Sequence, residues 1–224
     1  MSDKLENGCS YKVRSLGEKH CFTTPRHIED ISQFEKLLNV CEEAHEDEVI
    51  VLNVFCYGGC VNTAKAVYNA LRMTNATVYT VNKSVASSGG SVLLLAGDSI
   101  GIEPYAYTMI HTATYGHFPN KAPEIKASTD FHDRDIRTFY EEVYKGFLTD
   151  EELTDVLKGT PLYIHDISEH KERLERMFEY RKSIEEEFYD EQSQGLPTKE
   201  ELLKKTKREL VAMMVGEDDE GDSE

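Results

Sequence analysis

The sequence predicts an α/β fold with a mostly parallel sheet, followed by a helical extension on its C-terminal side. Two observations carry this prediction. Short runs rich in β-branched residues, such as 49–54 and 76–81, alternate with segments whose apolar residues recur at helical spacing. Beyond residue 121 the pattern becomes helical throughout. Alternating strands and helices are typical of a parallel sheet covered by helices.

The first half of the chain contains the clearest alternation. Residues 1–27 are polar, with short strands expected at most. A helix is predicted from Asp30, and Ser32 has capping-box spacing to Glu35. Residues 49–54 suit a buried parallel strand. After the glycine pair at 58–59, a helix is predicted from the apolar residues Val61, Ala64, Val67, Tyr68 and Leu71.

The middle of the chain is the most apolar. Residues 88–97 contain a continuous apolar run that is too short to span a bilayer, so a core helix is predicted there. Strands are expected at 99–102 and 107–110. One apolar stripe then marks a long helix: Ile136, Phe139, Tyr140, Val143, Tyr144 and Phe147. Thr149 and Glu152 have the spacing to cap the next helix.

The pattern divides the chain into four parts. Residues 1–27 form an N-terminal segment, and 28–168 form the main folded domain. Residues 169–215 are charged helices, interrupted by a Gly-Leu-Pro breaker, and 216–224 are an acidic tail that we expect to be disordered.

Charge and cysteine content exclude several classes of function. The net charge of −17 opposes binding to nucleic acid or to an anionic membrane, so neither is expected as a partner. The five scattered cysteines favour a reducing compartment, and no apolar secretory core is present, so a cytoplasmic location is expected. No set of metal ligands is recognisable, and no cofactor is expected.

Three short motifs carry the chemistry. A Gly-Gly turn at 58–59 lies between a predicted strand and helix, Ser88 and Gly89 open the core helix, and His111 follows a predicted strand. Backbone amides, a hydroxyl and an imidazole are the groups that acyl transfer requires. Each has an ordinary structural explanation: a tight turn, a helix cap and a partly buried histidine. Their occurrence together on consecutive βα units favours the catalytic interpretation.

These motifs resemble those of the Clp protease proteolytic subunit family. Gly58-Gly59-Cys60-Val61 is similar to its Gly-Gly-Ser-Val segment, Val85-Ala86-Ser87-Ser88 with Ala96-Gly97-Asp98 is similar to its nucleophile helix, and Met109-Ile110-His111 is identical to its histidine signature. The short spacing between the last two is closest to that of Clp-like peptidases of tailed bacteriophages. The resemblance covers roughly residues 28–165 and implies the crotonase-like ββα superhelix.

The resemblance assigns roles residue by residue. Ser88 is the nucleophile and His111 the general base, and the Gly58 and Gly89 amides form the oxyanion hole. Ser87 adjoins the nucleophile where the family usually has alanine, but its distance to Gly97 fits less well.

The third triad member is the aspartate that the family places ahead of a strand-like segment. Asp155 occupies that place, and its alternative reading is an exposed helix acid; Asp166 is a poorer candidate.

The resemblance therefore implies a serine endopeptidase that forms an acyl-enzyme and acts on peptides or unfolded proteins. It also implies a homo-oligomeric ring and a separate Clp-type ATPase, in the host cytoplasm if the chain is phage-encoded. Tyr57 stands where the family has proline, and the segment after Ile164 departs from the family pattern, which puts groove shape and assembly in doubt. Two alternatives stay open: a crotonase-type acyl-CoA enzyme, and a catalytically inactive assembly or adaptor protein on the same fold.

Overall fold

The computed structural model describes residues 17–114 and 121–193, so the predicted helix at 199–215 and the acidic tail lie outside the described residues. The chain divides into two compact units, Met1–Phe178 and Glu179–Glu224. The first unit contains the sheet and every predicted site residue. Within the second, the described residues continue one helix, which carries a Lys182–Glu186 ion pair one turn apart.

One sheet of six strands organises the first unit. Its strands are β1 (Lys19–Thr23), β2 (Val49–Cys56), β3 (Thr77–Ser87), β4 (Ser99–Ile102), β5 (Tyr107–Ile110) and β6 (Leu162–Ile164). The order is β1-β2-β3-β5-β6, and β4 pairs with the first half of β3. All pairs are parallel except β5 with β6. This confirms the predicted α/β fold with a mostly parallel sheet.

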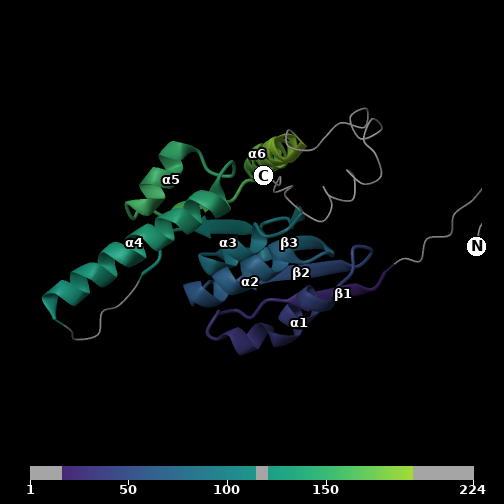
Figure 1. The fold of residues 1–224 in the computed structure, drawn as a ribbon, viewed down its shortest axis with the longest axis horizontal. Helices are drawn as coiled ribbons and strands as arrows, with labels where there is room; N and C mark the ends of the chain where they lie inside the picture. Colours follow the sequence, from purple (N-terminus) through teal and green to yellow (C-terminus); the bar gives the residue numbers. More distant parts are fainter. Residues whose placement is uncertain (1–16, 115–120, 194–224) are drawn as a thin grey trace, which may run out of the picture. The chain divides into compact units, whose positions relative to one another are not determined.

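Helices cover the sheet and extend the chain (Figure 1). They are the 3-10 turn η1 (Ile31–Phe34) and the helices α1 (Glu35–Glu43), α2 (Val61–Met73), α3 (Gly89–Leu94), α4 (Ala122–Tyr144), α5 (Asp150–Leu157) and α6 (Ile167–Ser193). The predicted cap of α5 is confirmed, because Thr149 and Glu152 form a capping box. The first capping box differs from the prediction: Asp30 and Gln33 form it, since the chain enters η1 two residues before Ser32.

The core lies where β2, β3 and α3 meet. Side chains of β2 alternate between buried and half-buried positions, so one face of the strand is fully covered and the other only partly. Every residue of α3 is buried, which confirms the predicted core helix. In contrast, α4 runs past the sheet in Figure 1, and its buried side chains begin only at Ile136.

The strand β3 is longer than the sequence predicted. The β-branched run at 76–81 ends before Asn82, and the strand continues through that residue to Ser87. The fully buried Asn82 amide donates to the Tyr107 carbonyl at 2.9 Å, so a polar side chain inside the sheet is satisfied by β5. This extension brings the end of β3 beside β5, where the site forms.

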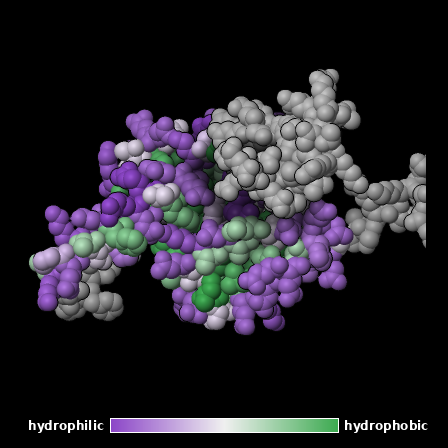
Figure 2. All heavy atoms as spheres, in the orientation of Figure 1, coloured by the Kyte–Doolittle hydropathy of each residue, from purple (hydrophilic) through white to green (hydrophobic). Residues whose placement is uncertain are grey.

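The surface of the described residues is mostly hydrophilic, with an apolar area between α1 and α2 (Figure 2). Exposed apolar side chains include Met73, at the end of α2, and Ile31 in η1. Among the described helices none is long and apolar enough to cross a bilayer.

The beginning of α6 is anchored by a buried arginine. Arg173, only 8% exposed, donates to Glu152 of α5 at 2.6 and 2.8 Å and to Glu169 at 2.8 Å. It also donates to the Phe147 carbonyl. The arginine's hydrogen bonds hold the pKa of Glu152 at about 2. The predicted boundary at residue 168 therefore falls within a helix whose first turns belong to the first unit.

Removing this arginine should destabilise the first unit. We expect Arg173→Met to lower the free energy of unfolding by about 2–3 kcal/mol, because partly buried carboxylates lose their counter-charge, although solvent still screens them. Urea unfolding measures the change. Lys145→Met, which removes a surface ion pair with Asp150, is the control and should stay within about 0.5 kcal/mol. An equal change in both variants would contradict the anchoring role.

His170 is a second buried polar residue of α6. Its ring lies 2.9 Å from Thr108 Oγ1 of β5 and 2.9 Å from the Asp166 carbonyl. Because a carbonyl only accepts, Nδ1 carries the proton and Nε2 accepts from the threonine hydroxyl. Burial lowers the pKa of His170 below 6.5. Folding thus favours the neutral form of this ring relative to the unfolded chain.

A pH dependence of stability follows from the His170 ring. Because the pKa of His170 is lower in the folded chain, the unfolded chain binds this proton at a higher pH than the folded chain does. Stability therefore falls as the pH decreases through and below 6.5. Glu152, with its pKa of about 2, does not titrate there. Between pH 7.5 and 5.5 we expect the melting temperature to fall about 2–4 °C more in the wild type than in His170→Gln. Parallel pH profiles would contradict this prediction.

Candidate active site

Ser88 occupies the turn between the end of β3 and the beginning of α3. Its backbone has φ 55° and ψ −123°, a region that costs a residue other than glycine about 1–3 kcal/mol. A strained strand-to-helix turn of this kind presents the nucleophilic serine in α/β-hydrolases. Ser88 is half-buried, whereas Ser87 is buried within β3 and pairs with Met109. The turn therefore presents Ser88 rather than Ser87.

The glycine pair packs directly against Ser88. Gly58 has φ 92°, and a Cβ built on it would lie 2.6 Å from Ser88 Cβ and 2.9 Å from the Gly89 nitrogen. Only glycine fits both the conformation and the space. The Ile28 amide donates to the Gly58 carbonyl at 2.8 Å, and the Cys60 amide donates to the Ile28 carbonyl at 2.7 Å. These bonds hold the loop beside the serine.

The amides of the two predicted oxyanion donors, Gly89 and Gly58, have different hydrogen-bond partners. As the first residue of α3, Gly89 has an amide without an acceptor inside its own helix. The Gly58 amide donates to Cys56 Sγ at 3.3 Å, and sulfur is a weak acceptor. The next amide, of Gly59, donates to none of the described residues. A negatively charged oxygen beside Ser88 would thus compete only with a weak bond.

His111 follows β5 directly, on the strand beside the serine turn. The Ser88 amide donates to the Met109 carbonyl at 2.8 Å, and Ser87 pairs with Met109 across the two strands. The backbones that carry Ser88 and His111 therefore adjoin. Within the described residues no hydrogen bond joins the Ser88 hydroxyl to the His111 ring. Such bonds often tighten only when substrate is bound.

The candidate carboxylates are not joined to His111. The Asp155 side chain is exposed on α5, between the buried residues Leu153 and Val156. Among the described residues it forms no hydrogen bond to the histidine. The Asp166 carboxylate accepts from the Ser168 and Glu169 amides and caps α6, which lowers its pKa. Asp166 is therefore occupied as a helix cap.

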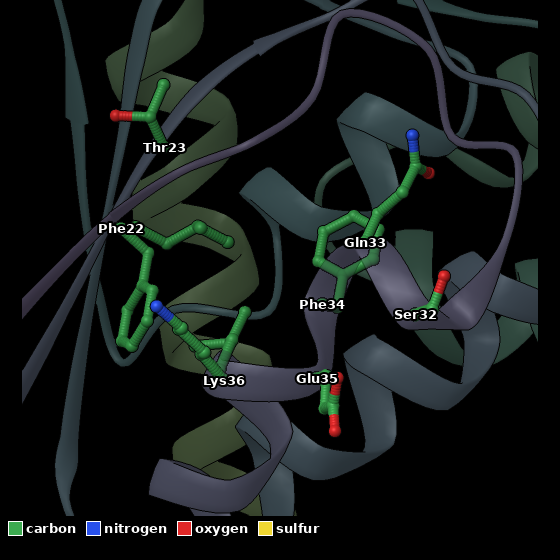
Figure 3. Close-up of a pocket in the computed structure, with 9 residues that line it drawn as sticks. Phe22, Thr23, Ser32, Gln33, Phe34, Glu35 and Lys36 are labelled. Atoms are coloured by element: carbon green, nitrogen blue, oxygen red, sulfur yellow. The ribbon is translucent and has the colours of Figure 1, made fainter.

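A small cavity of about 160 Å³ is lined by Thr112, the residue after His111, and by Ala113. Asp133, Ile136 and Arg137 of α4 and Leu157 at the end of α5 complete the lining. A second hollow of about 310 Å³ lies between β1 and the η1–α1 segment, where Phe22, Phe34 and Lys36 face it (Figure 3). The second hollow contains none of the predicted site residues.

The cysteines near the glycine pair have different environments. Burial raises the pKa of Cys56. Cys60 is exposed, and hydrogen bonds from Thr63 lower its pKa. In the described part of the chain no group of three His, Cys, Asp or Glu residues is arranged to hold a metal ion.

Two site neighbours on α4 are not predicted from the sequence. Tyr140 and Tyr144 belong to an apolar stripe, but their hydroxyl groups contact the backbone of His111 and the side chain of Ser91. Helical spacing indicates which residues are buried and does not indicate where a phenol hydroxyl finds its partner. A buried tyrosine usually requires such a partner, and that was the available signal.

The chain matches a known protein family over most of its length. Residues 13–145, more than half of the chain, match the family model described as Clp protease. The match includes the glycine pair, Ser88 and His111. It ends before α5, so Asp155 lies beyond the matched residues.

Proposed function

This chain belongs to the Clp protease family, and on that premise we propose that it is a serine endopeptidase with Ser88 as nucleophile and His111 as general base. The observation that carries the proposal is the strained backbone of Ser88, packed against Gly58 and bonded through its amide to the strand that ends at His111. Strain of this kind persists where the surrounding structure and a function maintain it.

The proposed reaction needs only groups of this chain and water. Ser88 Oγ bonds to the peptide carbonyl carbon while its proton passes to the His111 imidazole. The carbonyl oxygen becomes negative and accepts from Gly89 and from Gly58, or from Gly59 beside it. The C–N bond then breaks, and the imidazolium protonates the departing amine. Water, deprotonated by the imidazole, releases the acyl group from Ser88.

Asp155 remains the carboxylate proposed to orient His111. Its side chain is exposed and forms no hydrogen bond to the histidine among the described residues, so the proposed contact requires a movement of one of the two side chains. Leu157, two residues further on, lines the same cavity as Thr112, the residue after His111. Without such a movement Ser88 and His111 act as a dyad.

The labelling experiment uses the intact protein and a fluorophosphonate probe. We expect one adduct, on Ser88, with phosphorus bonded to Oγ and fluoride released. Mass spectrometry of the digested adduct separates Ser88 from Ser87. Protein denatured before the probe is added is the control, because a serine without its folded surroundings does not react with the probe. An adduct on Ser87, or none in the folded protein, would overturn the proposal.

We also propose that the chain assembles into a ring. Family membership supports a homo-oligomeric ring that encloses its active sites and receives peptide or unfolded protein substrates from a separate Clp-type ATPase, in a cytoplasmic setting. The short spacing between Gly97 and His111 supports a bacteriophage-type member. Light scattering of the native particle tests the ring.

A non-catalytic adaptor on the same fold is the second candidate. The observation in its favour is that no hydrogen bond joins Ser88 to His111 among the described residues. An adaptor would bind a partner and leave the probe unreacted. The acyl-CoA alternative has no comparable support, because it gives the strained serine no role.

A further inference from the structure

Two tyrosines one turn apart on α4 lie behind the proposed catalytic pair. Tyr140 is 3% exposed and Tyr144 is fully buried, and their rings meet edge to face with centroids 5.0 Å apart. Burial of two phenol rings explains their apolar packing. It does not explain where their hydroxyl groups point.

The Tyr140 hydroxyl donates to the His111 carbonyl at 2.9 Å. A carbonyl oxygen can only accept, so the direction of the bond is fixed. Burial raises the pKa of Tyr140 to about 12, which keeps the hydroxyl protonated and donating. His111 has left β5 at this point, because the strand ends at Ile110. The Tyr140 hydroxyl therefore holds the backbone of the proposed base through a side-chain hydrogen bond.

The Tyr144 hydroxyl reaches the nucleophile through Ser91. Ser91 Oγ donates to the Ser88 carbonyl at 2.6 Å and lies 2.7 Å from the Tyr144 hydroxyl. Because the single Ser91 proton goes to the carbonyl, the tyrosine must donate to Ser91. The Ser88 carbonyl also accepts from the Ser91 amide at 2.9 Å. The strained serine backbone is thus held from one side by α3 and, through one hydroxyl, by α4.

We propose that Tyr140 and Tyr144 are positioning residues that set the alignment of His111 and Ser88 through these two hydrogen bonds. The inference rests on the proposed function, because it assigns a role relative to that pair. Both tyrosines lie on adjacent turns of α4, so their hydrogen bonds hold the backbones of His111 and Ser88 relative to each other. They act where the backbones of the two residues adjoin and the described residues show no hydrogen bond between the Ser88 hydroxyl and the His111 ring. Small displacements decide whether such a bond forms.

The test compares Tyr140→Phe and Tyr144→Phe, which remove one hydroxyl each and keep the rings. Tyr105→Phe is the control, because Tyr105 is 98% exposed. The measurements are kcat and KM for a fluorogenic peptide, the rate of fluorophosphonate labelling, and the melting temperature. For each α4 variant we expect about a tenfold lower kcat and labelling rate, the scale of one lost hydrogen bond, with KM changed less than twofold.

A double-variant cycle separates positioning from general stability. If Tyr144 acts through Ser91, then Tyr144→Phe should add nothing in a Ser91→Ala background, whereas Tyr140→Phe should still lower kcat. Labelling rates equal to those of Tyr105→Phe, a loss that follows only the melting temperature, or additive effects of Tyr144→Phe and Ser91→Ala would overturn the inference. If the wild type itself is not labelled at Ser88, the proposed function fails as well; normal labelling of the wild type with unchanged α4 variants removes only this inference.

Discussion

Ser88→Ala is expected to reduce peptide hydrolysis to background, a loss of about 10⁶-fold in kcat. The reason is that no acyl-enzyme can form without the hydroxyl. Because Ser88 and His111 act on the same proton, His111→Ala should cost nearly as much, and the double variant should lose little more than either single variant. Hydrolysis of a fluorogenic peptide measures all three.

The neighbouring serine supplies the control for this experiment. Ser87→Ala removes a hydroxyl that is buried in β3 and should keep kcat within a fewfold of the wild type. Full activity of Ser88→Ala would end the assignment of the nucleophile. Strictly additive losses in the double variant would separate the serine from the histidine and argue against a shared proton transfer.

Gly58→Ala is expected to lower kcat by about 10²–10³-fold, the typical cost of losing one oxyanion donor. The added Cβ would lie 2.6 Å from Ser88 Cβ, so the glycine loop or the serine must move. Either movement separates the backbone amides from the reacting carbonyl. The positive φ of 92° also strains any side chain, so a loss of stability is expected as well.

Gly159→Ala is a matched control for the stability effect. Gly159 has φ 102°, close to that of Gly58, but a Cβ there would meet nothing within 4 Å. Both variants should therefore lose a similar amount of stability through backbone strain, about 1–3 kcal/mol. Only Gly58→Ala should lose activity per folded molecule. Equal loss of kcat in both variants would show that strain alone, rather than contact with Ser88, is responsible.

Much of the architecture was predictable from local patterns. The expected strands at 99–102 and 107–110 agree with β4 and β5, and the predicted helix after the glycine pair agrees with α2. β5 and α2 are recognisable because their burial repeats with the period of the element itself. The chain's membership in the Clp protease family was likewise visible in three short motifs.

Predictions weakened where polar residues are buried by distant contacts. The β-branched run that marks β3 in the sequence stops before Asn82, and the sequence does not show that β5 accepts a hydrogen bond from the Asn82 amide. Arg173 and His170 lie in a segment that reads as a charged surface helix, yet both are buried against α5 and β5. Glu152, the partner of Arg173 on α5, is 21 positions away in the sequence. Thr108, the partner of His170 on β5, is 62 positions away. No local pattern identifies such a partner.

The sequence by itself determined the order of strands and helices and the residue types available for acyl transfer, because burial periodicity and glycine placement are local properties of the chain. Tertiary structure alone decided which groups meet. It set the positive φ of Ser88, the contact of Gly58 with that serine and the two tyrosine bonds behind it. It also placed the Asp155 side chain in solvent. These features depend on strand register and on helices packed across the sheet, where a displacement of about one ångström decides whether a hydrogen bond exists.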